Sequence, residues 1–113
     1  MADEGTLATS AQTLLAIGQN ASAAQILEAN TNIWIKMAES LMSTDVDYDL
    51  VTNIAEFSAY QKQILALAAS SKAAMIGINQ DQSTWELALT QSKLNVLDNL
   101  YRESMDTIRK FAK

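Results

Sequence analysis

The chain of 113 residues has no cysteine, no histidine and no proline, and it has only 3 glycines. Without cysteine it can form no disulfide, iron–sulfur cluster or thiolate site. Without histidine it lacks the commonest metal ligand and the commonest general base. It also contains no glycine-rich phosphate loop, nucleophile elbow or cluster with metal-ligand spacing. We therefore expect no catalytic residue, no cofactor and no metal site, and hence no enzyme.

Basic charge is scarce as well, with 8 Lys and Arg residues against 13 Asp and Glu residues and a net charge of −5. A nucleic-acid-binding protein presents a basic face, so we expect no nucleic-acid partner. The first residues, Met-Ala-Asp-Glu, do not resemble the basic start of a cleavable secretory signal. The longest uncharged stretch, residues 5–27, contains too many Gln, Ser, Thr and Asn residues to form a transmembrane segment.

The N-terminal third of the chain is depleted in charge. Residues 5–35 contain one charged side chain, Glu28, among Ala, Ser, Thr, Gln, Asn and scattered aliphatic residues. A helix whose outer face is neither apolar nor charged is suited to lying against other protein. We therefore expect a subunit of an assembly, either a homo-oligomer or a polymer, alone or with a sibling subunit.

The scarcity of glycine and the absence of proline, in a chain rich in Ala, Leu, Gln and Met, predict an all-α protein with a single helical domain, residues 1–113. The predicted helices cover residues 6–17, 21–42, 48–76 and 84–111. The first two form an Ala/Gln-rich N-terminal helical arm (1–43), and the two long ones form an antiparallel helical hairpin.

Local signals place the ends of these helices. Gly18 is suited to end the first helix as a C′ glycine. Residues 43–49 form the clearest break, with N-capping residues and three acids at alternate positions. Residues 77–82 predict a second turn, and residues 83–86 (Ser-Thr-Trp-Glu) match a capping box at the start of the last helix.

Heptad seams predict how the helices pair. In the third helix the seam is Leu50, Ile54, Phe57, Gln61, Ile64, Ala68, Ser71 and Met75. In the fourth it is Leu87, Thr90, Leu94, Leu97, Tyr101, Ser104, Ile108 and Phe111. In the second helix, Leu27, Asn30, Trp34, Met37 and Leu41 form one stripe, and the flanking Ile33 and Ile35 predict burial on more than one side.

The larger side chains of these seams, with Tyr60, are candidates for contacts between helices or between subunits, since aromatic and aliphatic residues at helical spacing serve as core or interface anchors. The interface candidates are Leu27, Trp34, Met37, Leu41, Phe57, Tyr60, Ile64, Ala68, Met75, Leu94, Leu97 and Tyr101. Small residues in 66–74 allow the third helix to approach its neighbours closely.

Asp45, Asp47 and Asp49 superficially resemble the start of a calcium loop. An EF-hand needs glycine at its sixth position, which here is Leu50, so the pattern fails. With no histidine, any response to acid must come from carboxylates, whose ordinary pKa values lie near 4. We predict that crowding in an assembly raises the pKa values of these three aspartates, together with Glu56.

Two resemblances to known families follow from residue patterns. Residues 29–35 (Ala-Asn-Thr-Asn-Ile-Trp-Ile) and 60–76, in which a Tyr-Gln-Lys-Gln stretch runs into Ala, Ser and aliphatic residues, resemble the small R-body or "killing trait" proteins. This resemblance implies a structural subunit of a coiled proteinaceous ribbon in the bacterial cytoplasm, which unrolls to rupture membranes when triggered, often by acid.

The second resemblance covers residues 49–75. Asp49-Leu50-Val51, with Ile54 and residues 59–61 (Ala-Tyr-Gln), is similar to the C-terminal helix of flagellar rod and hook proteins and their type III secretion relatives. It implies an axial subunit that is exported without a cleavable signal. Both families consist of self-assembling helical subunits.

We therefore predict a self-assembling structural subunit of a bacterial ribbon or filament, packed laterally through its charge-depleted arm and the small-residue half of its third helix. Two other functions fit the same seams. One is a small helical adaptor or chaperone that binds a partner helix, and the other is a helical protein that coats an apolar surface.

Overall fold

The computed structural model describes residues 5–18, 25, 28–80 and 87–112. Within these residues it contains four α-helices and one short 3-10 helix, and no strand. The helices are α1 (Ser10–Ile17), α2 (Glu28–Val46), α3 (Ala59–Gln80) and α4 (Leu87–Phe111). The prediction of an all-α fold is confirmed.

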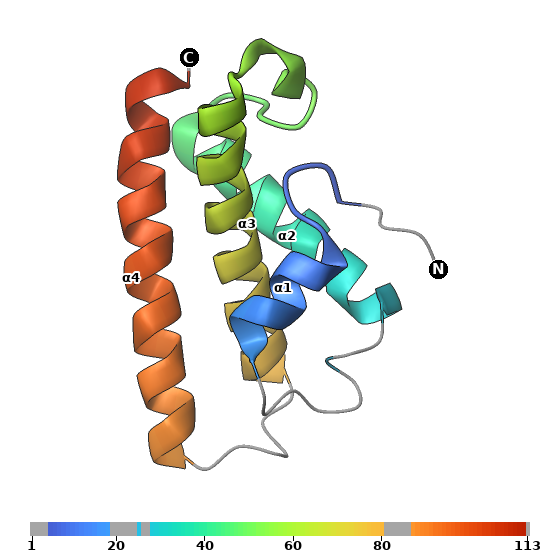
Figure 1. Cartoon of the computed structure of the whole chain (residues 1–113), viewed down its shortest axis with the longest axis vertical. Coiled ribbons are helices and arrows are strands. Elements are labelled where there is room, and N and C mark those ends of the chain that lie inside the picture. Colours follow the sequence, from blue (N-terminus) through green and yellow to red (C-terminus); the bar gives the residue numbers. More distant parts are fainter. Residues whose placement is uncertain (1–4, 19–24, 26–27, 81–86, 113) are drawn as a thin grey trace.

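Helix α3 lies at the centre of the molecule and contacts each of the other three α-helices. Figure 1 shows α4 running beside α3 in the opposite direction, so the predicted antiparallel hairpin of two long helices is confirmed. Helices α1 and α2 cross α3 on the side away from most of α4. The N-terminal arm is therefore folded onto the hairpin of its own chain.

Helix α1 begins later than predicted, at Ser10 instead of residue 6. The Thr9 hydroxyl accepts the Gln12 N–H at 3.1 Å, and the Gln12 side chain accepts the Thr9 N–H at 2.9 Å. This reciprocal capping box satisfies two of the N–H groups that every helix start leaves unpaired. Gly18 ends the helix with a φ of 92°, as the sequence predicted, because glycine adopts this left-handed region at little cost.

Helix α2 extends beyond the predicted end at residue 42 and reaches Val46. Asp47 then takes a φ of 53°, which only short polar residues and glycine adopt readily. The Tyr48 N–H donates to the Ser43 carbonyl at 3.1 Å, which closes the end of the helix. Helix α2 therefore ends four residues later than predicted, within the predicted break at residues 43–49.

Residues 48–58 are not part of a long helix, which corrects the predicted range 48–76. The Asp49 carboxylate accepts the Thr52 N–H at 3.0 Å and the Thr52 hydroxyl at 2.7 Å, so local side-chain bonds replace helical ones. A short 3-10 helix, Ile54–Glu56, follows. Ser58 and Gln61 then exchange hydrogen bonds of 3.2 and 2.8 Å in a second capping box before α3 begins.

At its other end α3 continues through Gly77 to Gln80, so the predicted turn at 77–82 does not begin at Gly77. A Cβ atom on Gly77 would lie only 2.7 Å from a ring carbon of Trp34. This glycine therefore gives the Trp34 ring room to lie against the backbone of α3. The capping box predicted at 83–86 lies outside the described residues.

Candidate interaction surfaces

Several uncharged polar residues of the N-terminal arm are buried inside the chain. The Thr31 hydroxyl donates to the Ser10 hydroxyl at 2.8 Å, and Ser10 donates to the Asn32 side chain at 3.2 Å; all three residues are buried. The buried carboxylate of Glu39 accepts the N–H groups of Thr6 and Leu7, both at 2.6 Å. Buried polar groups must be hydrogen-bonded, and these residues satisfy one another between α1 and α2.

The small residues of α3 are likewise used within the chain. Ala68, Ala69, Ala73 and Ala74 are completely buried, as three other helices crowd around α3. The chain therefore covers part of the surface expected for lateral packing between subunits. The arm and this part of α3 still expose other side chains, among them Leu15 and Leu67.

The structure sorts the predicted interface residues into three groups. Those buried in the core are Trp34, Phe57, Ala68, Met75 and Leu97. Those partly buried and packed against the core are Ile64, Leu94 and Tyr101. Those exposed are Met37, Leu41 and Tyr60, whereas Leu27 lies outside the described residues. The exposed group is the most accessible to a partner of the folded chain.

Phe57 and Tyr101 illustrate the intramolecular role of the seams. The Phe57 ring meets the Phe111 ring edge-on at 5.5 Å and the Tyr48 ring at 6.5 Å, so it joins the 48–58 segment to the end of α4. The Lys72 ammonium lies 5.1 Å from the centre of the Tyr101 ring, a cation–π contact between α3 and α4. Burial raises the pKa of Tyr101, and the nearby Asp45 carboxylate adds to this effect.

The first exposed apolar surface is a ridge on α2, formed by Ile33, Met37 and Leu41. These side chains are 55%, 42% and 48% exposed. They correct the prediction that Met37 and Leu41, with Trp34, join α2 to the hairpin. Helix α2 instead packs through Trp34, Ile35, Ala38 and Met42, all of which are buried. We call the exposed set the α2 ridge.

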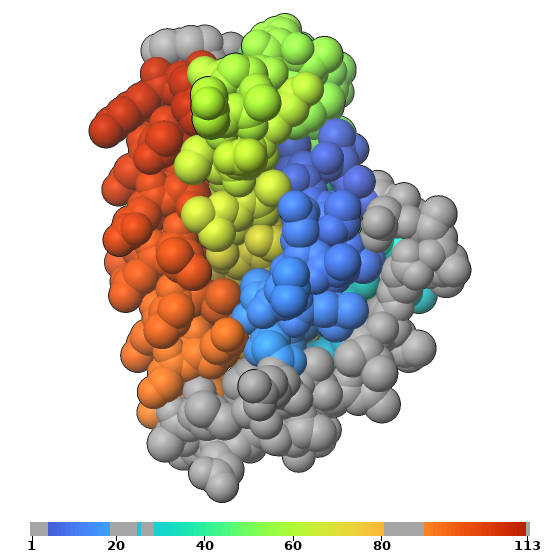
Figure 2. Space-filling model, viewed as in Figure 1, coloured from blue at the N-terminus to red at the C-terminus, as the bar shows by residue number. Residues whose placement is uncertain are grey.

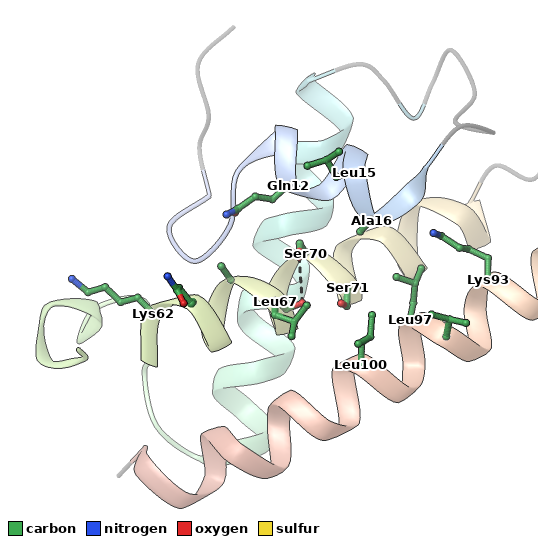
Figure 3. A pocket seen from close by; sticks show the side chains of 13 residues that line it. Gln12, Leu15, Ala16, Lys62, Leu67, Ser70, Ser71, Lys93, Leu97 and Leu100 are labelled. Atoms are coloured by element: carbon green, nitrogen blue, oxygen red, sulfur yellow. Dashed lines mark hydrogen bonds between the residues drawn. The ribbon is translucent and has the colours of Figure 1, made fainter. Parts of the chain in front are cut away.

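The second surface is a groove of about 650 Å³ between α1, α3 and α4, which we call the α3 groove. Figure 2 shows these three helices exposed together on one face of the molecule. Figure 3 shows the residues that line the groove. They are Gln12, Leu15, Ala16, Lys62, Gln63, Ala66, Leu67, Ser70, Ser71, Lys93, Val96, Leu97 and Leu100.

Apolar residues dominate the α3 groove, and several of them are well exposed for their type. Leu15 is 82% exposed, Val96 54% and Leu67 38%. None of these three lies on a predicted seam, and for that reason the sequence analysis did not select them. These three residues could have been identified as aliphatic residues that lie outside the seam of their helix.

The aspartates at 45–49 do not form one repulsive cluster. Asp45 pairs with Arg109 of α4, which also pairs with Asp106 at 2.8 Å. The backbone N–H and then the hydroxyl of Thr52 lower the pKa of Asp49. A lowered pKa is opposite to the rise predicted for an assembly, although the free chain does not test the assembly itself.

Glu56 and Asp47 have separate environments. Glu56 accepts a hydrogen bond from the Tyr48 hydroxyl, and this bond, followed by burial, raises the pKa of Tyr48. Asp47 is exposed at the left-handed turn that follows α2. Asp45, Asp47, Asp49 and Glu56 therefore lie in one segment of the chain, but three of them are engaged with different partners.

Within the part of the chain that the structure describes, no group of three or more acidic side chains is placed to hold a metal ion. In the same residues no helix combines the length and the hydrophobicity needed to cross a bilayer. The two surfaces that stand out, the α2 ridge and the α3 groove, are of a kind that binds protein side chains.

No protein-family model, no curated protein and no solved structure matches this chain. The resemblances to R-body and flagellar proteins therefore remain predictions from residue patterns.

Proposed function

We propose that this chain is a structural subunit of a bacterial ribbon or filament and that it acts through helix contacts with neighbouring subunits, with no catalytic activity. The observation that carries the proposal is the presence of two exposed apolar surfaces on different elements of one chain. The α2 ridge belongs to α2 alone, and no residue of α2 lines the α3 groove. A subunit with two such surfaces can contact two neighbours at once.

Two different surfaces favour an open assembly. When unlike patches meet head to tail, the contact repeats indefinitely unless the rotation closes a ring. The ridge contains only three apolar side chains, which is small beside the roughly 800 Å² per partner of a standard stable interface. A weak contact of this kind gains strength when it is repeated along a polymer.

The R-body resemblance supports a ribbon in the bacterial cytoplasm over a secreted axial filament, because it extends into α2, whereas the flagellar resemblance begins at residue 49. In this proposal lateral packing uses the α2 ridge and the α3 groove, and the groove is lined by residues of both the charge-depleted arm and the small-residue half of α3. The neighbour is a second copy of the chain or a sibling subunit.

Sedimentation and negative-stain microscopy of the purified chain, at neutral pH and near pH 5, test the proposal. We expect ribbons or filaments for the unaltered chain and smaller species for the Met37→Gln, Leu41→Gln double variant. Both replaced side chains are exposed, so the free energy of unfolding should stay within about 0.5 kcal/mol of the parent value.

The matched control is Asn99→Gln, an exposed change on α4 that should leave the assembly intact. A single small species for the unaltered chain at both pH values, at every concentration measured, would contradict solitary assembly. A ribbon that persists in the double variant would remove the α2 ridge from the proposal.

The second candidate is a helical adaptor that binds one partner helix, and the α3 groove is the observation that favours it. Sedimentation separates the two candidates, since an adaptor stays a discrete monomer or dimer without its partner.

A further inference from the structure

We infer that the α3 groove binds an amphipathic helix of a neighbouring subunit, whose apolar side chains enter the groove and whose carboxylates lie at its two ends. This inference rests on the proposed function only in that both require the chain to act through helix contacts. It names the occupant of one surface by its chemistry.

The shape of the groove fits a short helix. Its lining on α3 runs from Lys62 to Ser71, which corresponds to about 14 Å at roughly 1.5 Å per residue, or two to three helical turns. Amphipathic helices bind grooves of this kind through apolar residues at positions i, i+3 or i+4, and i+7. Ala16, Ala66 and the two serines in the lining are small and let such a helix approach closely.

The floor of the groove offers few polar groups to a partner side chain. Ser70, the most nearly central polar residue on α3, donates its hydroxyl to the Leu67 carbonyl at 3.2 Å. Leucines from each of the three helices surround it: Leu15, Leu67, Leu97 and Leu100. A partner side chain that enters here is therefore apolar, since a polar one would lose its bonds to water without replacement.

The charge around the groove specifies the partner further. Lys62 and Lys93 lie towards opposite ends of the groove (Figure 3), and no Asp or Glu lines it, although the chain as a whole carries a net charge of −5. Among the described residues neither lysine takes part in a salt bridge. Two cations outside the salt bridges of the described residues, at the ends of an apolar groove, complement a helix with carboxylates flanking its apolar face.

Lys93 also lies close to the C-terminus of α1. Its ammonium lies 3.6 Å from the place that a Cβ atom on Gly18 would occupy, next to the C-terminus of α1. The partial negative charge of a helix C-terminus favours a cation there. The lysine is therefore placed at the mouth of the groove before a partner arrives.

Two synthetic helical peptides of equal length test the inference against the full chain. Both carry leucine at i, i+3 and i+7, and they differ only in flanking residues, Glu in one and Lys in the other. We expect the Glu peptide to bind about tenfold more tightly, a difference of about 1.4 kcal/mol, and to lose this advantage as salt is raised.

Charge reversal and steric block identify the site. The Lys62→Glu, Lys93→Glu double variant should reverse the preference between the peptides, and Ala66→Phe should weaken binding of both by about tenfold. Lys110→Glu, an exposed change on α4 outside the groove, is the matched control and should behave as the unaltered chain. Urea unfolding of each variant verifies that it remains folded.

Equal binding of the two peptides, binding of neither, or an unchanged preference in the double variant would overturn the inference. Filament formation is measured separately by sedimentation. If filaments form but the two peptides bind equally well, the proposed function stands and the inference about the groove fails. If the Glu peptide is preferred but no filaments form, only the inference about the groove stands.

Discussion

Gly77 shows how a residue type that usually marks a turn can serve packing inside a helix. It lies within α3, and the buried ring of Trp34 covers its Cα, with the indole N–H of Trp34 donating to Gln80 at 3.0 Å. The Gln25 side chain donates to the Gly77 carbonyl at 3.0 Å. A glycine inside a helix costs about 1 kcal/mol relative to alanine, and here the close approach of the ring offsets that cost.

Replacement of Gly77 by alanine should therefore destabilise the chain in spite of its better helix propensity. The new Cβ would lie 2.7 Å from a ring that burial and its hydrogen bond hold in place, so the overpacking cost of about 1–3 kcal/mol outweighs the gain. We expect the free energy of unfolding in urea to fall by about 1 kcal/mol. Asn79→Ala, an exposed change on the same helix, is the control and should not destabilise. An increase in stability for Gly77→Ala would show that the ring moves freely.

The hydrogen bonds of Asp49 predict how the stability of the chain changes as the pH falls. Its pKa is lowered below 3.8, first by the Thr52 N–H and then by the Thr52 hydroxyl, so the charged form is favoured in the folded state. A lowered pKa contributes stability above the unfolded value, and this contribution is lost as the pH falls through the folded pKa.

Asp49→Asn should therefore be less stable than the parent at neutral pH, and the difference should narrow only below about pH 3.8. Urea unfolding of both chains at intervals between pH 7 and pH 2 measures this difference. An Asp49→Asn variant that is more stable than the parent at neutral pH, by a margin that shrinks as the pH falls, would mean that folding raises the Asp49 pKa.

At the scale of single elements, α2 shows what periodicity leaves open. Its sequence is apolar on several sides, and the stripe through Trp34, Met37 and Leu41 fits a heptad as well as the observed buried face does. That face passes through Trp34, Ala38 and Met42, rotated about the helix axis by roughly one residue position. Contacts with α3 and with residues 6–10 determine which face of α2 is buried. These contacts join distant parts of the sequence, so the local pattern of residues does not predict them.

Two methionines of α2 provide a matched test of this face. Met42 is completely buried and Met37 is 42% exposed. Met42→Ala should lower the free energy of unfolding by about 2–4 kcal/mol, because it removes buried contacts and leaves a cavity. Met37→Ala should change it by less than about 0.5 kcal/mol. Equal losses, or a larger loss at Met37, would contradict the orientation of α2.

At the scale of the whole molecule, α3 joins everything else. Helices α1, α2 and α4 each pack on it, and its residue Leu65 is completely buried. A domain built around one central helix has no part that can separate without exposing the rest. Small domains of this kind usually unfold in a single cooperative step.

We therefore expect far-ultraviolet circular dichroism and Trp34 fluorescence, followed in a Trp85→Phe background, to report one urea midpoint. Leu65→Ala should lower both midpoints together, in line with a loss of about 2–4 kcal/mol. Phe57→Leu, which keeps most of the buried volume near the end of α4, should shift both far less. An earlier transition for one probe would show that the arm unfolds apart from the hairpin.

The all-α class and the antiparallel pairing of the two long helices follow from local chemistry: no proline, few glycines and two heptad seams, each readable within one segment. The capping boxes at Thr9 and Ser58, which mark the observed starts of α1 and α3, can also be read from the local sequence. The α3 groove, the α2 ridge and the burial of the uncharged arm depend on which faces meet across the chain. Charge depletion in residues 5–35 indicated contact with protein. Helix α3 of the same chain supplies part of that contact, because its small side chains let both arm helices pack closely against it.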